Sequence, residues 1–331
     1  MCIAKPMLIL RRTLVGLAAA AVLVVPTLGF AQDWPTRPIK LIVPFPTGGG
    51  TNAVARLLGD QLTKSLGQPV IVDNRPGGNG IIGALATVRA EPDGYTFMFA
   101  TGSVLTGVML TVKSLPYDTL RDLQPITLVG NGPYLLVANP AFPPNTLAEM
   151  IAYAKAHPTE VNYASPGGST VNFFLAEILN LSAGIKTTHI PYKGSSALIT
   201  DLLGGHVQYT LDTPGSTLAL IREKKLKVLA VLANERLSKL PNVPTMVELG
   251  YPNVVGGSWY GLVAPVKTPK AIITRMHAAV VAALKTPELR KAFEERDVVP
   301  GGNTPEEFTK FIQAELAKWG DLINKLGIKP E

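Results

Sequence analysis

Two turns of similar sequence constrain the fold of this chain more than any other feature. They are PFPTGGGTN, residues 44–52, and ASPGGSTVN, residues 164–172. Each follows a short apolar run typical of a buried strand and precedes an amphipathic pattern typical of a helix. Glycines allow a ligand close to the backbone, and the first N–H groups of a helix lack partners inside it and lie at the positive end of its dipole. The pair predicts that a small anion binds between two lobes.

The order of the predicted elements indicates the fold class. Apolar runs and helical patterns alternate over residues 39–100, and a second series of the same kind covers residues 134–233. This alternation predicts an α/β protein with two lobes and mostly parallel or mixed sheets. Three Thr-Pro pairs after residue 267 each predict the start of a helix, and we expect these helices to pack on the first lobe.

A chain organised in this way passes between its lobes twice, near residues 130–134 and near residues 252–258. Two crossings make a hinge that can close over a ligand. The predicted lobe I comprises residues 32–131 and 256–331, and the predicted lobe II comprises residues 132–255.

The first 31 residues have the features of a secretion signal. Arg11 and Arg12 precede an apolar stretch at residues 13–28, and residues 29–31 match a small-x-small cleavage pattern. We therefore expect an exported, soluble chain whose mature form begins at Gln32. An uncleaved membrane anchor is the competing hypothesis, although the apolar stretch is short for a span of about 20 residues and contains Pro26.

Composition and motifs exclude several classes of function. The net charge of +7 is spread along the chain without a basic stripe interleaved with aromatic residues, so no nucleic-acid partner is expected. The only cysteine, Cys2, precedes the apolar stretch, so neither a lipid anchor at the cleavage point nor a disulfide is expected. No Gly-x-Ser-x-Gly sequence is present, and the four histidines have no metal-type spacing. The histidines are His157, His189, His206 and His277. The sequence thus predicts no metal site, no cofactor and no catalytic residue.

Each of the two turns also has a purely structural explanation. The first turn lacks the lysine of a phosphate-binding loop and the third glycine of a dinucleotide-binding loop, so by itself it could be only a tight connection. A second turn of the same kind in a second lobe favours a shared binding site, because ligands bind at the carboxyl ends of strands in such sheets. The second turn contributes four candidate residues, Ser165, Gly168, Ser169 and Thr170.

Other strand ends add candidates at the same crevice. Thr101 and Ser103 follow the strand predicted at residues 95–100, and Asp212 follows the strand predicted at residues 207–211. Asp212 could cap the next helix, contact a ligand across the cleft, or do both. The RPGGNG stretch, residues 75–80, is interpreted as a structural connection between a strand and a helix.

Seven stretches of the chain, taken together and in this order, resemble the Bug-type receptors of tripartite tricarboxylate transport systems. They span nearly the whole chain after the predicted signal: WPTRPIKLIVPFPTGGGTNAVAR (34–56), LGQPVIVDNRPGGNGIIGA (66–84), EPDGYTF (91–97), HIPYKG (189–194), DLLGGHV (201–207), NVPTMVELGYP (242–252) and SWYGLVAPVKTP (258–269). The resemblance implies a two-lobed periplasmic-binding-protein fold of the Venus-flytrap, type II-like kind. It also implies a periplasmic receptor that captures a small organic anion, such as a di- or tricarboxylate or an aromatic acid, and delivers it to integral membrane permease subunits. We expect it to be a monomer.

The resemblance further implies which residues hold the ligand. In such receptors the loops that match residues 45–52 and 165–170 grip a carboxylate with backbone amides, hydroxyls and bridging water. The positions concerned are Thr47, Gly49, Thr51, Ser169 and Thr170.

One position departs from the family pattern. The family loop usually carries aspartate where this chain has Asn52, and an amide carries no charge and donates as well as accepts hydrogen bonds. We therefore expect altered selectivity, with amino acids disfavoured, set by cleft side chains such as Phe45, Asn52 and Asp212.

Two other functions stay open on the sequence. One is an exported hydrolase or isomerase that uses Asp212 as a general base, which requires a histidine or second carboxylate within hydrogen-bond reach. The other is a sensor subunit that presents its closed form to a signalling kinase.

Overall fold

The computed structural model of the protein describes residues 34–327. The chain forms two compact units, Met1–Thr36 and Arg37–Glu331. Only residues 34–36 of the first unit are described, and they belong to no helix or strand. The predicted signal, residues 1–31, and the predicted mature start at Gln32 lie outside the described residues. Within residues 34–327, no helix has both the length and the apolar character that a membrane crossing requires.

The second unit contains a six-stranded mixed sheet with the order β11-β4-β10-β3-β1-β2. Strand β1 pairs in parallel with β2 and β3, whereas β10 is antiparallel to β3 and β4, and β11 is antiparallel to β4. The strands are β1 (Ile39–Val43), β2 (Val70–Asn74), β3 (Thr96–Thr101), β4 (Leu123–Pro133), β10 (Gly257–Pro265) and β11 (Val299–Pro300). This sheet and the helices that pack on it are called the first lobe.

A five-stranded mixed sheet with the order β7-β6-β8-β5-β9 forms the second lobe. Strand β6 is parallel to β7 and β8, and β5 is antiparallel to β8 and β9. In both sheets, three parallel strands have the earliest strand in the middle, and the strands beyond them pair antiparallel, three in the first sheet and two in the second. The predicted repetition of one architecture is therefore confirmed. The strands are β5 (Leu135–Ala138), β6 (Asn162–Ser165), β7 (Thr188–Pro191), β8 (Tyr209–Asp212) and β9 (Lys227–Val231).

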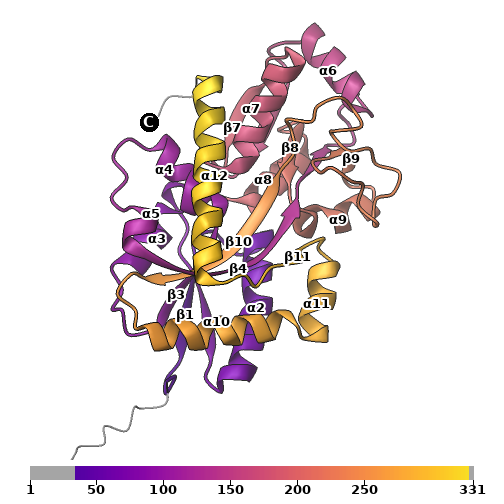
Figure 1. The fold of residues 1–331 in the computed structure, drawn as a ribbon. Coiled ribbons are helices and arrows are strands. Elements are labelled where there is room, and N and C mark those ends of the chain that lie inside the picture. The colour runs from indigo at the N-terminus through magenta and orange to yellow at the C-terminus, as the bar shows by residue number, and fades with distance from the viewer. Residues whose placement is uncertain (1–33, 328–331) are drawn as a thin grey trace, which may run out of the picture. The chain divides into compact units, whose positions relative to one another are not determined.

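The chain passes between the two sheets twice (Figure 1). The passages lie between β4 and β5, and between β9 and β10. Backbone hydrogen bonds tie them together: the N–H of Tyr134 donates to the oxygen of Gly256 (3.1 Å), and the N–H of Leu232 donates to the oxygen of Tyr134 (2.9 Å). The two-crossing hinge is therefore formed by paired backbone segments, while the lobe boundaries at residues 131–132 and 255–256 stay a prediction.

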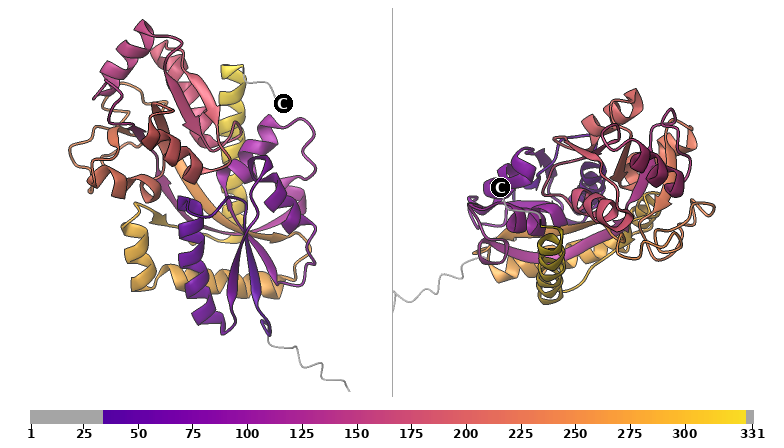
Figure 2. Two further views of the ribbon diagram at one scale, coloured as in Figure 1. Left: turned by 180° about the vertical axis from the view of Figure 1, so that it is seen from behind. Right: turned by 90° about the horizontal axis from the view of Figure 1, so that it is seen from above.

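Helices cover both sheets (Figures 1 and 2). The helices before β5 are α2 (Gly50–Leu66), the 3₁₀ turn η1 (Gly78–Gly80), α3 (Ile81–Val88), the π-helical turn η2 (Ser103–Gly107), α4 (Val108–Thr111) and α5 (Thr119–Asp122). Those after it are α6 (Leu147–Ala156), α7 (Val171–Ala183), α8 (Ser195–Gly204), α9 (Pro214–Arg222), α10 (Lys270–Leu284), α11 (Pro287–Glu294) and α12 (Pro305–Leu326).

All three Thr-Pro pairs lie at helix starts, and the predicted threonine cap is confirmed at two of them. Thr286 and Thr304 are N-caps whose hydroxyls accept from backbone N–H groups three residues later, with proline at the first helical position. Thr268 is not a cap: Pro269 occupies the N-cap of α10, and the Thr268 hydroxyl donates to the oxygen of Pro265 (2.8 Å).

The last helix belongs to both lobes, which corrects the expectation that it packs on the first lobe alone. Helices α10 and α11 contact α2, whereas α12, the long yellow helix of Figure 2, contacts both β4 and α7. Trp319 of α12 is only 2% exposed and packs against Phe174 of α7, with ring centroids 5.7 Å apart. The aromatic contact explains the correction, since it buries an indole in the core of the second lobe.

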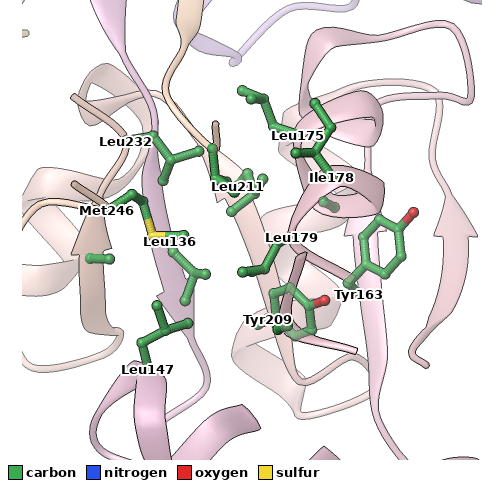
Figure 3. Packing of buried hydrophobic residues seen from close by; sticks show 14 of the residues in the cluster. Leu136, Leu147, Tyr163, Leu175, Ile178, Leu179, Tyr209, Leu211, Leu232 and Met246 are labelled. Atoms are coloured by element: carbon green, nitrogen blue, oxygen red, sulfur yellow. The ribbon is translucent and has the colours of Figure 1, made fainter. Parts of the chain in front are cut away.

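That core fills the space between the second sheet and α7 (Figure 3). Leu136, Tyr209 and Leu211 of the sheet face Leu175 and Leu179 of α7. The close packing gives β6 and β8 a rigid support, so the residues at their carboxyl ends are held in fixed positions.

Candidate functional site

The two predicted turns meet at one cavity of about 40 Å³ in the second unit. The start of α2 contributes Gly49 to Asn52, and the start of α7 contributes Thr170 to Asn172. The carboxyl ends of β3 and β8 also reach it. Eight of the twelve predicted residues line this cavity: Phe45, Gly49, Thr51, Asn52, Thr101, Ser103, Thr170 and Asp212. The remaining four belong to the same two turns but are not among the lining residues: Thr47, Ser165, Gly168 and Ser169.

The start of α2 lies against the second lobe. The N–H of Gly50 donates to the Oγ of Ser216 in α9 (3.2 Å). A Cβ atom on Gly50 would lie 2.6 Å from the Thr213 Oγ1, whereas one on Gly49 would lie 3.8 Å from the Ser195 Cβ, an ordinary contact. The close approach of the first turn to the second lobe therefore requires glycine at position 50 more than at position 49.

The side chain of Asn52 is committed to protein partners, although the residue lines the cavity. Its Nδ2 donates to the Oδ1 of Asn74 (3.1 Å), and its Oδ1 accepts from the Nε of Arg56 (3.3 Å). Asn74 in turn donates to the carbonyl oxygen of Phe45 (2.9 Å). This chain of hydrogen bonds holds the first turn, because it connects helix α2 to the backbone where the turn begins.

The second turn is stabilised from within. Thr170 caps α7 by accepting from the N–H of Phe173 (3.4 Å), and its hydroxyl donates to the oxygen of Gly167 (2.7 Å). Ser165 is fully buried, and its Oγ lies 2.7 Å from the Nε2 of His189. Burial lowers the pKa of His189 to about 4, so the imidazole is neutral at pH 7. Ser165 thus lies behind the turn, as part of its support.

The glycine that the second turn needs is Gly167, not the predicted Gly168. Gly167 has a φ of +140°, and a Cβ there would lie 2.1 Å from the Oδ1 of Asn79. A Cβ on Gly168 would meet nothing within 4 Å among the described residues. Gly167 therefore has a positive φ and also lies directly against Asn79 of the first lobe, and both features require glycine.

Thr47 and Ser169 join the two lobes at the rims of the cavity. The Thr47 carbonyl oxygen accepts from the Oγ of Ser196 (3.0 Å). The Oγ of Ser169 is 2.7 Å from the Oγ1 of Thr111 and accepts from the Nδ2 of Asn79 (3.2 Å). The structure is therefore closed around the cavity. Asn79 belongs to RPGGNG, so this connection also takes part in the contact between lobes.

Asp212 is a buried carboxylate in the wall of the cavity. It is 2% exposed, and its Oδ1 accepts from the N–H of Thr213 (2.6 Å). Its Oδ2 has no hydrogen-bond partner among the described residues, and neither has the Oγ1 of Thr101. Burial raises the pKa of Asp212 to about 6, and nearby hydroxyls offset part of this effect.

The expectation that Asp212 caps the next helix is wrong. The N-cap of α9 is Thr213, because β8 includes Asp212 and Pro214 occupies the first helical position. Among the described residues that line the cavity, Asp212 is the only carboxyl group, and none is a histidine. The partner that a general base would need is thus not found in this wall.

Several cavity residues were not predicted from the sequence. Ser258 and Trp259 belong to the SWYGLVAPVKTP stretch and could have been found from that resemblance. Tyr134 comes from the hinge and Ser195 from the start of α8, and neither has a distinguishing local pattern. The further lining residues are Pro46, Gly50, Gly102, Pro166, Val171, Asn172, Thr213 and Gly257.

Comparison with known proteins identifies the family. The family model "Tripartite tricarboxylate transporter family receptor" matches residues 54–328. The chain belongs to this family. Its members are periplasmic binding proteins that work as receptors for membrane transporters. The resemblance to Bug-type receptors and the two-lobed periplasmic-binding-protein fold are thereby confirmed.

Individual family members are similar over nearly the whole chain. Protein BugT of Bordetella pertussis is 39% identical over 90% of this chain and 92% of its own. An R. palustris protein solved with adipate is 32% identical, with a TM-score of 0.87 over 90% of this chain and 100% of its own. MatC from Rhodopseudomonas palustris, solved with bound malate, is 31% identical, with a TM-score of 0.84 over 88% of this chain and 100% of its own.

Proposed function

We propose that this family member binds a small carboxylate in the cavity between its lobes and delivers it to integral membrane permease subunits. Two relatives of similar structure, solved with adipate and with malate, support a carboxylate as the ligand. The proposal includes binding without turnover, a monomeric receptor, and export to the periplasm with cleavage before Gln32.

One observation carries the proposal: two helices, α2 and α7, begin at the same cavity. The N–H groups of Gly50, Val171 and Phe173 bond to the hydroxyls of Ser216, Ser103 and Thr170. The other first N–H groups of the two helices have no partner inside the helix and lie at the positive end of its dipole. An anion between two such ends gains favourable contacts from both lobes. Each contact of this kind stabilises by only about 0.3–1 kcal/mol at an exposed site and by more in a partly buried one, which suits reversible capture.

Closure of the lobes supplies the rest of the affinity. Ser196 and Ser169, both of the second lobe, hydrogen-bond to Thr47, Thr111 and Asn79 of the first lobe. A ligand that contacts both helix starts favours this closed form over an open one, since only the closed form brings the two starts together.

A ligand screen tests the proposal. The purified receptor is heated with di- and tricarboxylates, hydroxy acids, amino acids, aromatic acids and neutral amides, and Kd is then measured by calorimetry. A ligand present at about 100 times its Kd stabilises the folded state by about 2.7 kcal/mol, and we expect at least one carboxylate to do so. Failure of every carboxylate to stabilise the protein, with turnover of one of them, would contradict the proposal.

A further inference from the structure

The proposed function leaves one buried polar atom of the cavity wall without a role, the Oδ2 of Asp212. It is buried in the wall of the cavity and has no hydrogen-bond partner among the described residues. A buried acceptor without a partner is unfavourable, so such groups ordinarily face a donor that belongs to water or to a ligand. The Oγ1 of Thr101 is a second buried polar atom of the same wall that has no partner within the described part of the chain.

The charges around the cavity make this group selective. Among the described lining residues, no lysine, arginine or histidine is present to balance a second negative charge. A ligand carboxylate held by the helix starts would share a closed space with Asp212. A further acceptor opposite the Oδ2 would be repelled, whereas a donor there would satisfy it.

We propose that Asp212 determines specificity by accepting a hydrogen bond from the ligand, so that the receptor selects a small carboxylate bearing an ammonium, amide N–H or hydroxyl donor. This inference rests on the proposed carboxylate-binding function and deepens it. Asn52 is less suited to this role, because its Nδ2 already bonds to Asn74 and its Oδ1 to Arg56, so each atom keeps only one further hydrogen-bonding site. The negative charge of the site thus comes from Asp212, and ligands with an ammonium group are favoured, contrary to the expectation drawn from Asn52.

The same geometry gives ligands without a donor a distinctive pH dependence. The groups that face Asp212 are the hydroxyls of Ser195, Thr213 and Ser216 and the phenols of Tyr134 and Tyr260. Burial raises the pKa of both phenols, that of Tyr260 to about 12, so Asp212 alone among these groups titrates between pH 5 and 8. A ligand without a donor is accommodated only when a proton from the solvent binds between its carboxylate and Asp212.

Three acids with one carbon skeleton test the inference: succinate, which has no donor, malate, which has a hydroxyl, and aspartate, which has an ammonium group. Calorimetry at pH 7.5 in two buffers of different ionisation enthalpy gives both Kd and the number of protons taken up. We expect malate or aspartate to bind at least about tenfold more tightly than succinate. Succinate is expected to take up about one proton and the preferred acid none. The matched sets built on glutarate and adipate cover longer ligands.

The variant Asp212→Asn separates this role from a structural one. Its amide keeps the acceptor for the Thr213 N–H and replaces the Oδ2 with a donor, so the preference is expected to fall to within about threefold and proton uptake to disappear. Asp60→Asn, which removes an exposed carboxylate on α2, should retain both properties. If Asp212→Asn binds carboxylates with an unchanged preference for malate or aspartate over succinate, this inference alone is overturned. The same holds if the unaltered protein binds succinate without proton uptake and as tightly as malate and aspartate. Binding of no carboxylate at all overturns the proposed function and this inference with it.

Discussion

The backbone N–H of Gly50 donates a hydrogen bond of 3.2 Å to the Oγ of Ser216. Gly50 is the first residue of α2 and Ser216 lies in the first turn of α9, so two helix starts from different lobes contact each other beside the cavity. A Cβ on Gly50 would lie 2.6 Å from the Thr213 Oγ1. Closure of the lobes therefore depends on the absence of a side chain at this position.

Gly50→Ala is accordingly expected to disfavour the closed form. The added methyl group contacts Thr213 only when the lobes meet, so the open form stays folded. Ligand affinity should fall by roughly tenfold or more, because the closed form that binds the ligand becomes a minor state. Calorimetry with a ligand found in the screen measures the affinity, and small-angle X-ray scattering measures closure. Gly59→Ala, on the same helix but away from the cavity, is the matched control, because its Cβ would make only ordinary contacts with Val70 and Val72. Equal affinities of the two variants would contradict this account of closure.

Ser169→Ala tests the opposite rim of the cavity. The substitution removes the Oγ that bonds to Thr111 and Asn79 across the lobes. Since each of the two hydrogen bonds contributes about 0.5–1.5 kcal/mol, we expect affinity to fall about fivefold or more. The melting temperature without ligand should change little, because each lobe keeps its own core. Ser182→Ala, at an exposed site near the end of α7, provides the control. A variant that bound ligand as tightly as the control would show that this rim does not contribute to closure.

Asp212→Asn is expected to stabilise the protein at neutral pH. Burial raises the pKa of Asp212 from 3.8 to about 6, so the folded state binds more protons than the unfolded state within this interval. Stability due to Asp212 therefore falls as pH rises from about 4 to 6, and the ionised carboxylate remains unfavourable at higher pH. The corresponding free energy is at most about 3 kcal/mol.

Chemical denaturation of the ligand-free protein at pH 4 and at pH 7.5 measures this difference. The variant should be more stable than the unaltered protein at pH 7.5, and the gap should narrow markedly at pH 4. Asp60→Asn should produce no such pH-dependent gap. A variant that is less stable at pH 7.5 would mean that the Oδ2 has a favourable partner in solution.

Much of the fold could be predicted from local sequence patterns, because most strands are short apolar runs bounded by turns. Strands β4 and β10 were not predicted, since Gly130, Gly132 and Gly261 interrupt them. The structure supplies the reason: a Cβ on Gly261 would lie 2.1 Å from the ring of Phe308, and one on Gly132 would lie 2.4 Å from the oxygen of Asp297. Glycine in these strands marks close packing against helix and loop, which no local pattern reveals.

The residues of the candidate site likewise divide into those that local sequence patterns predict and those that only the folded chain brings together. Thr101, Ser103 and Asp212 could be proposed because polar residues at carboxyl ends of strands gather at one edge of a sheet. Tyr134 and Ser195 could not, because the hinge and the neighbouring α8 bring them to the cavity only in the folded chain. The roles of Ser165 and Ser169 also depended on partners distant in sequence, His189 and Thr111.

His189 is expected to affect stability with the opposite pH dependence to Asp212. Burial lowers the pKa of His189 from 6.5 to about 4, so the unfolded state binds more protons than the folded state between these values. Stability due to His189 is complete above pH 6.5 and is lost as pH falls toward 4. His189→Gln keeps a nitrogen near the Ser165 Oγ but cannot titrate. The variant should lose some stability at pH 7.5, because it loses the ring contacts with Tyr163 and Phe173. It should nevertheless lose less stability than the unaltered protein on acidification to pH 5. Denaturation curves of both proteins at the two pH values decide the matter, and an equal acid sensitivity would show that the imidazole is not held neutral behind the second turn.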